Sequence, residues 1–309
     1  MRPKHLLSIT DLTSSQLWQV LKLAKKLKLE LKKKGKNKPL LADKTLVMIF
    51  EKPSLRTRIS FEIGMTQLGG HAIYLGPADI GMGTREPVKD IASVTCRMAD
   101  IIMARTFKHS IVEELAKYSR VPVINGLSDW EHPCQTLADL LTMWEVKGKL
   151  KGAKVAFLGD SENNVTHSLA LACVKLGINF ITASPKGYWL NPKIGRLACL
   201  AGRRVRQTDD PVEAVRNADV VYTDTWISMG DEAQKKKRLK IFPPFRVTAK
   251  LMKLAKKTAI FMHDLPAYRG NEVEASVIDG KQSVIYQQAE NRLHAQKALM
   301  VWLLNPGVA

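Results

Sequence analysis

The chain has 309 residues, of which 45% are hydrophobic and 25% charged, an ordinary globular balance and enough sequence for two α/β domains. No apolar run approaches the roughly 18 residues that span a membrane, and the first residues lack the apolar stretch of a signal peptide, so we expect neither. The four cysteines are scattered without a C-x-x-C pair, which argues against a disulfide framework or a zinc site and favours a reducing cytoplasm: Cys96, Cys134, Cys173 and Cys199.

The charge is unusual, with 48 Lys and Arg against 29 Asp and Glu, a formal net charge of +19. Such a balance favours anionic ligands, either phosphorylated metabolites or nucleic acid. The lysines gather in residues 22–38 and 235–240 without interleaved aromatic residues, which favours a solvated basic face over a nucleic-acid groove. Nucleic acid is therefore not an expected partner.

The first half of the sequence alternates between helix and strand patterns. A helix is predicted first, capped by Ser8 or Thr10, because apolar residues from Leu17 to Leu27 recur at helical spacing. Strands are predicted at residues 45–50, 72–75, 101–104 and 121–124, and an amphipathic helix at residues 59–68.

The second half repeats the alternation after a long predicted helix over residues 139–149. Strands are predicted at residues 154–159, 180–183, 220–223 and 259–262, and a last helix at residues 289–304. Such alternation implies parallel sheets covered on both faces. We predict an α/β fold of two doubly wound parallel-sheet domains, hinged near residues 132–150, with the final helix returning to the first domain. The predicted domains are residues 1–133 with 290–309, and residues 134–289.

Ligands of such sheets bind at the carboxyl ends of the strands, so the loops there are the candidate sites. The loop after the first strand contains Ser54, Arg56 and Thr57 and leads directly into a helix. A helix N-terminus attracts anions, and an arginine can bind a phosphate through two charge-assisted bonds. The alternative is an ordinary capped helix with solvated arginines.

Two further strand ends carry polar residues of the same kind. Arg105 closes one strand, and His132 and Gln135 lie three residues apart at the entry to a helix, where both can face one pocket. Taken singly, the arginine could be solvated and the His-Pro pair could be a turn. Together they favour an anion site at one edge of the first sheet.

These motifs resemble the carbamoyl-phosphate half of the aspartate/ornithine carbamoyltransferase superfamily: S-L-R-T-R at 54–58, M-A-R at 103–105 and H-P-C-Q-T-L-A-D at 132–139. The second half is similar to the ornithine branch, through G-D-S-E-N-N at 159–164, D-T-W-I-S-M-G at 224–230 and E-N-R at 290–292. The resemblance covers essentially the whole chain, in order and with comparable spacings.

The resemblance implies transfer of the carbamoyl group of carbamoyl phosphate to the δ-amine of ornithine, giving citrulline and phosphate for arginine biosynthesis. It implies no metal or cofactor, and a homotrimer or a multiple of trimers. Of the implied site, Arg56, Arg105, His132 and Asp264 would be catalytic. Carbamoyl phosphate would contact Ser54, Leu55, Arg56, Thr57, Arg105, His132, Gln135, Leu265 and Arg292, and ornithine Asn164, Asp224, Ser228 and Met229.

The sequence departs from the family pattern at two places. In H-D-L-P at 263–266, Asp264 replaces the usual cysteine beside the reacting amine. Its carboxylate could raise the pKa of the amine, act as a general base, or turn away while the backbone carbonyls of Asp264 and Leu265 bind. Near Gly81 many members carry a Gln that reaches a neighbouring subunit, which Gly81 cannot do, although Arg85 could.

Other functions remain as alternatives at this point. A relative that carbamoylates another amine, such as putrescine or lysine, is one, although putrescine offers no amino-acid end for Asp224. A non-catalytic paralogue that binds carbamoyl phosphate is another, although such a protein has no reason to keep Arg56, Arg105, His132 and Arg292 together. The turn at 159–164 lacks G-x-G-x-x-G, so a dinucleotide-binding protein is not expected.

Overall fold

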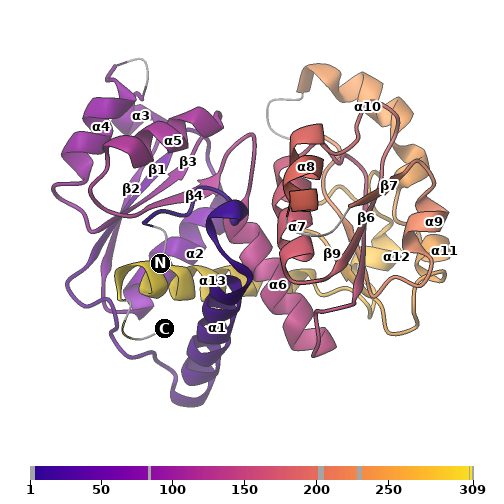
Figure 1. The fold of residues 1–309 in the computed structure, drawn as a ribbon, viewed down its shortest axis with the longest axis horizontal. Helices are drawn as coiled ribbons and strands as arrows, with labels where there is room; N and C mark the ends of the chain where they lie inside the picture. The colour runs from indigo at the N-terminus through magenta and orange to yellow at the C-terminus, as the bar shows by residue number, and fades with distance from the viewer. Residues whose placement is uncertain (1–3, 83–84, 201–204, 228–231, 306, 308–309) are drawn as a thin grey trace. The chain divides into compact units, whose positions relative to one another are not determined.

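The computed structural model describes residues 4–82, 85–200, 205–227, 232–305 and 307 (Figure 1). The chain forms two compact units, which are described separately below. Unit 1 contains Met1–Leu141 and Glu290–Ala309, and unit 2 contains Thr142–Ala289. Within the described residues, every helix is too short or too polar to cross a membrane.

Unit 1 is built on a parallel sheet of four strands in the order β2-β1-β3-β4. The strands are β1 (Thr45–Phe50), β2 (His71–Leu75), β3 (Ile101–Arg105) and β4 (Val123–Leu127). Because β2 lies on one side of β1 and β3 on the other, the order of the strands reverses between β1 and β3. This reversal is the topological switch point, where the loops after neighbouring strands part and leave room for a ligand.

Helices cover both faces of this sheet (Figure 1). Helices α4 (Val88–Thr95) and α5 (His109–Tyr118) pack with the sheet in one apolar core, which includes Ile49, Ile102 and Leu115. The opposite side carries α2 (Leu55–Gln67) and the C-terminal part of α13 (Ile285–Leu304), where Gly64 leaves room for Lys297 and Met300. The remaining elements are η1 (Ile9–Asp11), α1 (Ser14–Lys34) and α3 (Pro77–Ile80).

Unit 2 is built on a parallel sheet of five strands in the order β7-β6-β5-β8-β9. The strands are β5 (Lys154–Leu158), β6 (Asn179–Ala183), β7 (Arg206–Thr208), β8 (Val220–Thr223) and β9 (Ile260–Met262). Here the switch point lies between β5 and β8, which end in register at Leu158 and Thr223. Both units therefore place a switch point beside their first strand.

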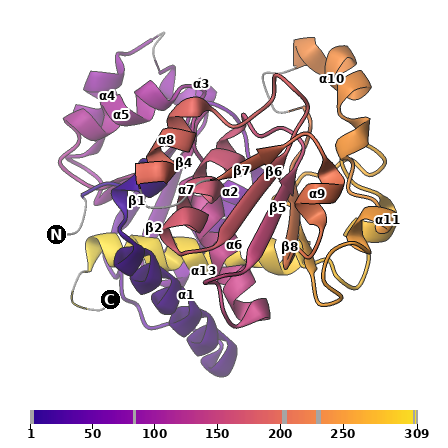
Figure 2. The ribbon, with the colours of Figure 1, turned by 45° about the vertical axis from the view of Figure 1, so that its right-hand side comes forward.

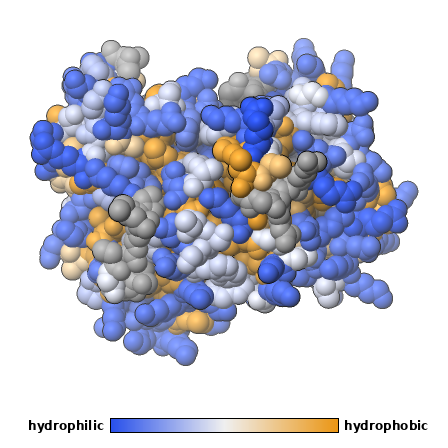
Figure 3. All heavy atoms as spheres, viewed as in Figure 1, coloured by the Kyte–Doolittle hydropathy of each residue, from blue (hydrophilic) through white to orange (hydrophobic). Residues whose placement is uncertain are grey.

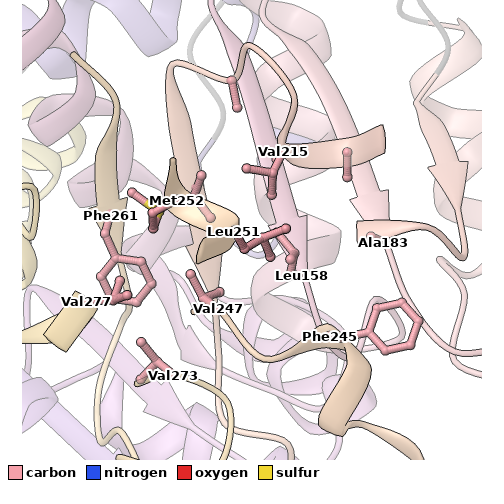
Figure 4. Close-up of a cluster of buried hydrophobic side chains, with 14 of the residues drawn as sticks. Leu158, Ala183, Val215, Phe245, Val247, Leu251, Met252, Phe261, Val273 and Val277 are labelled. Carbon is pink, nitrogen blue, oxygen red and sulfur yellow. The ribbon is translucent and has the colours of Figure 1, made fainter. Parts of the chain in front are cut away.

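The second sheet is also covered on both faces, with α7 (Asn164–Lys175) and α8 (Pro192–Leu200) on one face and α9 (Pro211–Val215), α11 (Ala249–Met252) and α12 (Ala275–Ile278) on the other (Figure 2). Figure 4 shows the core of the second face, where Leu158, Val247, Phe261 and Val273 pack together. The remaining elements are α6 (Pro133–Lys147), η2 (Glu232–Gln234), α10 (Lys235–Ile241) and η3 (Pro243–Phe245).

The structure confirms the predicted α/β class, the two parallel sheets and the return of the final helix to the first part of the chain. Most of the face in view in Figure 3 is hydrophilic. The lysines of α1 and the turn after it contribute to an exposed basic surface: Lys22, Lys26, Lys32, Lys33, Lys34, Lys36 and Lys38.

Several predicted boundaries were wrong, among them those of α2, which begins at Leu55, and of β4, which spans Val123–Leu127. The cap of α1 is Thr13, whose side chain accepts from the Gln16 N–H, whereas Ser8 caps the short helix η1. Helices α6 and α13 begin earlier than predicted, at Pro133 and Ile285. Strand β7 was missed because its three residues are polar, partly exposed and too few to show a period.

Candidate active site

The first candidate site lies at the switch point of unit 1, where the chain leaves β1 and β3. Helix α2 begins there at Leu55, and the Ser54 side chain caps it by accepting from the Thr57 N–H at 3.4 Å. The Arg292 guanidinium of α13 donates to the buried Thr57 hydroxyl at 2.7 Å. The loop is therefore a capped helix N-terminus, as the alternative of an ordinary capped helix predicts. It also contacts Arg292, which lies 235 residues after Thr57 in the sequence.

Four cations converge on His132 in the same unit. The imidazole is buried, and its pKa is held well below the usual value first by burial and then by Arg292, Arg105, Lys52 and Arg56. The ring is therefore neutral at neutral pH. Like charges brought together in a dry place repel one another, and a bound anion would relieve that repulsion. The cluster has the charge and burial of a phosphate site.

Helix α6 supplies the other predicted residue of this site. Gln135 is fully buried, and its amide nitrogen donates to Asp139 at 2.9 Å. Because only the amide nitrogen can donate, that bond fixes the positions of the nitrogen and the oxygen. Among the described residues, the Gln135 oxygen has no hydrogen-bond partner. The oxygen is thus available to a ligand N–H. Next to it, burial raises the pKa of the Cys134 thiol to about 12, so this cysteine is an inert packing group.

Lys52 belongs to this cluster although sequence reasoning did not select it. It is 8% exposed and lies over the Phe107 ring at 5.0 Å. Its position two residues after β1, at the edge where ligands bind, was the available signal. The predicted residue Leu55 is 70% exposed at the first position of α2.

The second candidate site lies at the switch point of unit 2, in the loops after β5 and β8. Gly159 ends the first strand with φ +120, and a side chain there would meet Trp226. Asn163 caps α7, accepting from the Thr166 N–H at 2.7 Å, and donates to the Asp224 carboxylate at 3.4 Å. The predicted residue Asn164 is the first residue of α7 and is partly buried. Asn163, whose side chain donates to Asp224, was not selected from the sequence.

A buried ion pair joins these two loops to α10. The Arg238 guanidinium donates to the Asp160 carboxylate and, at 3.0 Å, to the Trp226 carbonyl. It also lies over the Tyr188 ring at 5.0 Å, and Phe242 closes the cluster. Arg238 and Asp160 side chains are 8% and 7% exposed. This arrangement fixes the loops on either side of the switch point.

The loop after β9 brings Asp264 close to Asp224. Atoms of Asp224, His263 and Asp264 lie within 4.8 Å of one another, and Asp224 is buried. Two carboxylates at up to 4.8 Å repel by about 3 kcal/mol at an effective dielectric constant near 20. Burial first, and then Asp264, raises the pKa of Asp224 well above its usual value. Leu265, predicted for the carbamoyl-phosphate set, follows in the left-handed backbone region with φ 63.

Two aspartates and a histidine are also the residue types that bind divalent cations. Here, however, the His263 Nδ1 atom accepts from the Leu265 N–H at 2.9 Å, and Nε2 lies 3.4 Å from the Glu272 carboxylate. The Nδ1 lone pair, which a metal ion would need, already accepts the Leu265 N–H. The cluster therefore does not fit a metal ion.

Each unit thus gathers its own set of predicted residues. Ser228 and Met229 lie outside the described residues. Gly81 ends α3 with φ +53, where an added side chain would meet Arg85 at 2.7 Å, and Arg85 itself is exposed. The departure at Gly81 therefore has a local structural reason.

Two family models match the chain. Residues 4–145 match the carbamoyl-P binding domain of aspartate/ornithine carbamoyltransferase, and residues 151–303 match its Asp/Orn binding domain. The chain belongs to the aspartate/ornithine carbamoyltransferase family.

Relatives and solved structures point to one branch of that family. The chain is 50% identical over 301 residues to the ornithine carbamoyltransferase of Archaeoglobus fulgidus, covering 97% of each chain. It is 50% identical over 305 residues to the anabolic ornithine carbamoyltransferase of Pyrococcus furiosus, covering 97% of this chain and 96% of the other. The solved Pyrococcus furiosus structure superimposes with a TM-score of 0.93 at 50% identity, covering 99% of this chain and 98% of the other.

Proposed function

We propose that this protein transfers the carbamoyl group of carbamoyl phosphate to the δ-amine of L-ornithine, releasing citrulline and phosphate, as a step in arginine biosynthesis. The observation that carries the donor half is the ring of four cations around the neutral His132. The names of the relatives, among them an anabolic enzyme, support ornithine as the acceptor.

The carbamoyl-phosphate domain is assigned to residues 1–133 with 290–309. In it, the phosphate binds at the N-terminus of α2, where backbone N–H groups and the helix dipole favour an anion. Arg56, Arg105 and Arg292 bind the phosphate oxygens, and the Ser54 and Thr57 hydroxyls add shorter-range hydrogen bonds. Lys52 adds a fourth positive charge.

The carbamoyl group is oriented by neutral groups. His132 donates a hydrogen bond to the carbonyl oxygen, whose negative charge grows when the amine attacks. Losing one such donor typically costs about 3–4 kcal/mol of transition-state stabilisation. The Gln135 oxygen accepts from the carbamoyl NH₂, and the Leu265 carbonyl is a further acceptor for that group.

The ornithine domain is assigned to residues 134–289. Asp224 binds the α-ammonium, and Asn164, Ser228 and Met229 hold the amino-acid end. Asn163, which already contacts Asp224, keeps that carboxylate in place. Putrescine has no amino-acid end for these groups, so it is a poorer acceptor.

The proposed reaction needs no metal or cofactor. The neutral δ-amine attacks the carbamoyl carbon, the tetrahedral intermediate expels phosphate, and the phosphate accepts the proton that the amine gives up. Orientation of two reactants in a water-poor site supplies much of the rate in such reactions.

The active form is a homotrimer or a multiple of trimers in the cytoplasm. An exposed apolar row on α2, formed by Leu55, Ile59 and Ile63 at four-residue spacing, supports self-association. Ile73 of the neighbouring edge strand β2 extends it. Free thiols at Cys96, Cys134, Cys173 and Cys199 suit a reducing compartment.

The deciding experiment is citrulline formation from carbamoyl phosphate with ornithine, run beside putrescine, lysine and N-acetylornithine. Turnover with ornithine and little with the other amines is expected. Turnover with another amine alone would show that this amine, and not ornithine, is the acceptor. Binding of carbamoyl phosphate without turnover would indicate a non-catalytic paralogue. Retention on DNA that survives physiological salt would contradict the expectation that nucleic acid is not a partner.

A further inference from the structure

Asp224 and Asp264 form a carboxyl pair in unit 2. Atoms of the two side chains lie within 4.8 Å of each other, Asp224 is buried, and the Asp264 side chain is only 13% exposed. Two ionised carboxylates this close and largely shielded from water repel each other, whereas a proton on one of them removes the repulsion and lets that carboxyl group donate to the other. The geometry of the pair therefore favours one acid and one carboxylate.

The surroundings of the pair favour that single proton. The charged group that acts next most strongly on Asp224 is another acid, Glu272, which is 1% exposed. The His263 Nδ1 atom accepts from the Leu265 N–H and therefore donates no hydrogen bond to the pair. Arg238 of α10 donates to the Trp226 carbonyl, two residues after Asp224, but its guanidinium is paired with Asp160. Burial and the neighbouring carboxyl raise the pKa of Asp224 for the same reason.

We propose that the Asp224–Asp264 pair holds one shared proton in the free protein and releases it to solvent when the α-ammonium of the acceptor amino acid binds. This inference rests on the proposed function, which places that ammonium on Asp224. The O–H bond of one carboxyl breaks, its proton passes to water, and the ammonium replaces it as the positive charge between two carboxylates. No bond of the ligand changes.

L-Norvaline is the probe that separates this event from the chemistry. It has the α-ammonium and carboxylate of ornithine but no δ-amine, so it cannot be carbamoylated and carries no second ammonium that could lose a proton. Its binding is measured by calorimetry near neutral pH with saturating carbamoyl phosphate, in two buffers of different ionisation enthalpy. About one proton released per site is expected, because the pair passes from one proton to none.

Three variants decide the outcome. Asp264→Asn and Asp264→Cys should bind norvaline with proton release reduced to near zero, whereas Asp209→Asn, which removes an exposed acid on the same unit, should release as much as the wild type. Proton release that is absent in the wild type, or unchanged in both Asp264 variants, would overturn the proposal. Loss of norvaline binding in the wild type would instead remove the assignment of Asp224 to the α-ammonium, and the citrulline assay would show separately whether the activity stands.

Discussion

Burying an arginine destabilises a protein unless an anion or hydrogen-bond acceptors compensate its charge. Arg292 is 3% exposed and lies in the cluster that also contains Arg56, Arg105 and Lys52. Its guanidinium donates to the Thr57 hydroxyl at 2.7 Å. At the scale of single residues, this is where the donor site is most vulnerable. Lysine keeps the charge at such a place but loses the planar, forked donor.

Arg292→Lys should therefore raise the KM for carbamoyl phosphate and lower kcat/KM by roughly 30-fold to 1000-fold, corresponding to about 2–4 kcal/mol of lost charge-assisted bonding. Steady-state kinetics with each substrate varied in turn measure this, and the KM for ornithine should change much less. Arg97→Lys is the matched control, since Arg97 is exposed in the same unit. Equal kinetics for the two variants would contradict the assignment of Arg292.

Asp264→Cys is expected to keep activity and to move the pH profile toward lower pH. A nearby carboxylate raises the pKa of an amine, so its removal lets the δ-amine lose its proton at lower pH. Removing Asp264 also removes a cause of the raised pKa of Asp224, so Asp224 should ionise, and bind the substrate ammonium, at lower pH too. The effect on the δ-amine and the effect on Asp224 therefore both move the pH profile toward lower pH. The measurement is kcat/KM for ornithine from pH 6 to 10, and an unchanged profile would reduce Asp264 to a spacer.

Motifs found most of the candidate residues, but only those that a local pattern marks. Arg105 ends a strand, and Arg56 and His132 come a few residues after one, so all three could be selected from the sequence. Lys52 and Asn163 were not selected, because lysine and asparagine are common in loops and only the folded contacts distinguish them. The proximity of Asp224 and Asp264 also required the structure, since the order β5-β8-β9 brings their loops together.

Among the secondary-structure elements, α10 has the clearest structural task. It carries Arg238, which holds the loop after β5 through Asp160 and the loop after β8 through the Trp226 carbonyl. The alternation of strands and helices was predictable from hydrophobic periods. The order of the strands, and hence which loops become neighbours, was not, because periodicity carries no information on pairing partners.

Arg238→Met should destabilise the protein by about 3–5 kcal/mol, because it leaves the Asp160 carboxylate buried without its partner. Urea unfolding followed by tryptophan fluorescence measures this change in stability. The double variant Asp160→Leu with Arg238→Met removes both charges and should recover much of the loss. A double variant no more stable than Arg238→Met alone would show that the pair is not the source of the effect.

For the whole molecule, the exposed row of Leu55, Ile59 and Ile63 has no cover within the described residues of its own chain. A hollow beside it is lined by Arg58, Glu62 and Thr66 as well. The polar rim around an apolar row is the composition of a subunit interface.

If the proposed trimer forms through this row, Ile59→Lys combined with Ile63→Lys should convert it to monomers, because the double change places two positive charges on each copy of the row. Sedimentation velocity measures the mass of the wild-type protein and of the double variant. Leu254→Lys, a change at an exposed leucine of unit 2, should leave the mass of the assembly unaltered. A trimer that persists in the double variant would show that the subunit interface does not lie on this row.

The return of α13 to unit 1 also orders events during synthesis. The sheet of unit 1 is complete once β4 has left the ribosome, yet the bonds from Arg292 to Thr57 and from Lys297 to Asn37 come from α13, which follows unit 2 in the sequence. Unit 2 must be translated in between. A nascent chain can therefore fold most of its first half early, but it closes these two buried bonds only after the whole of unit 2 has been made.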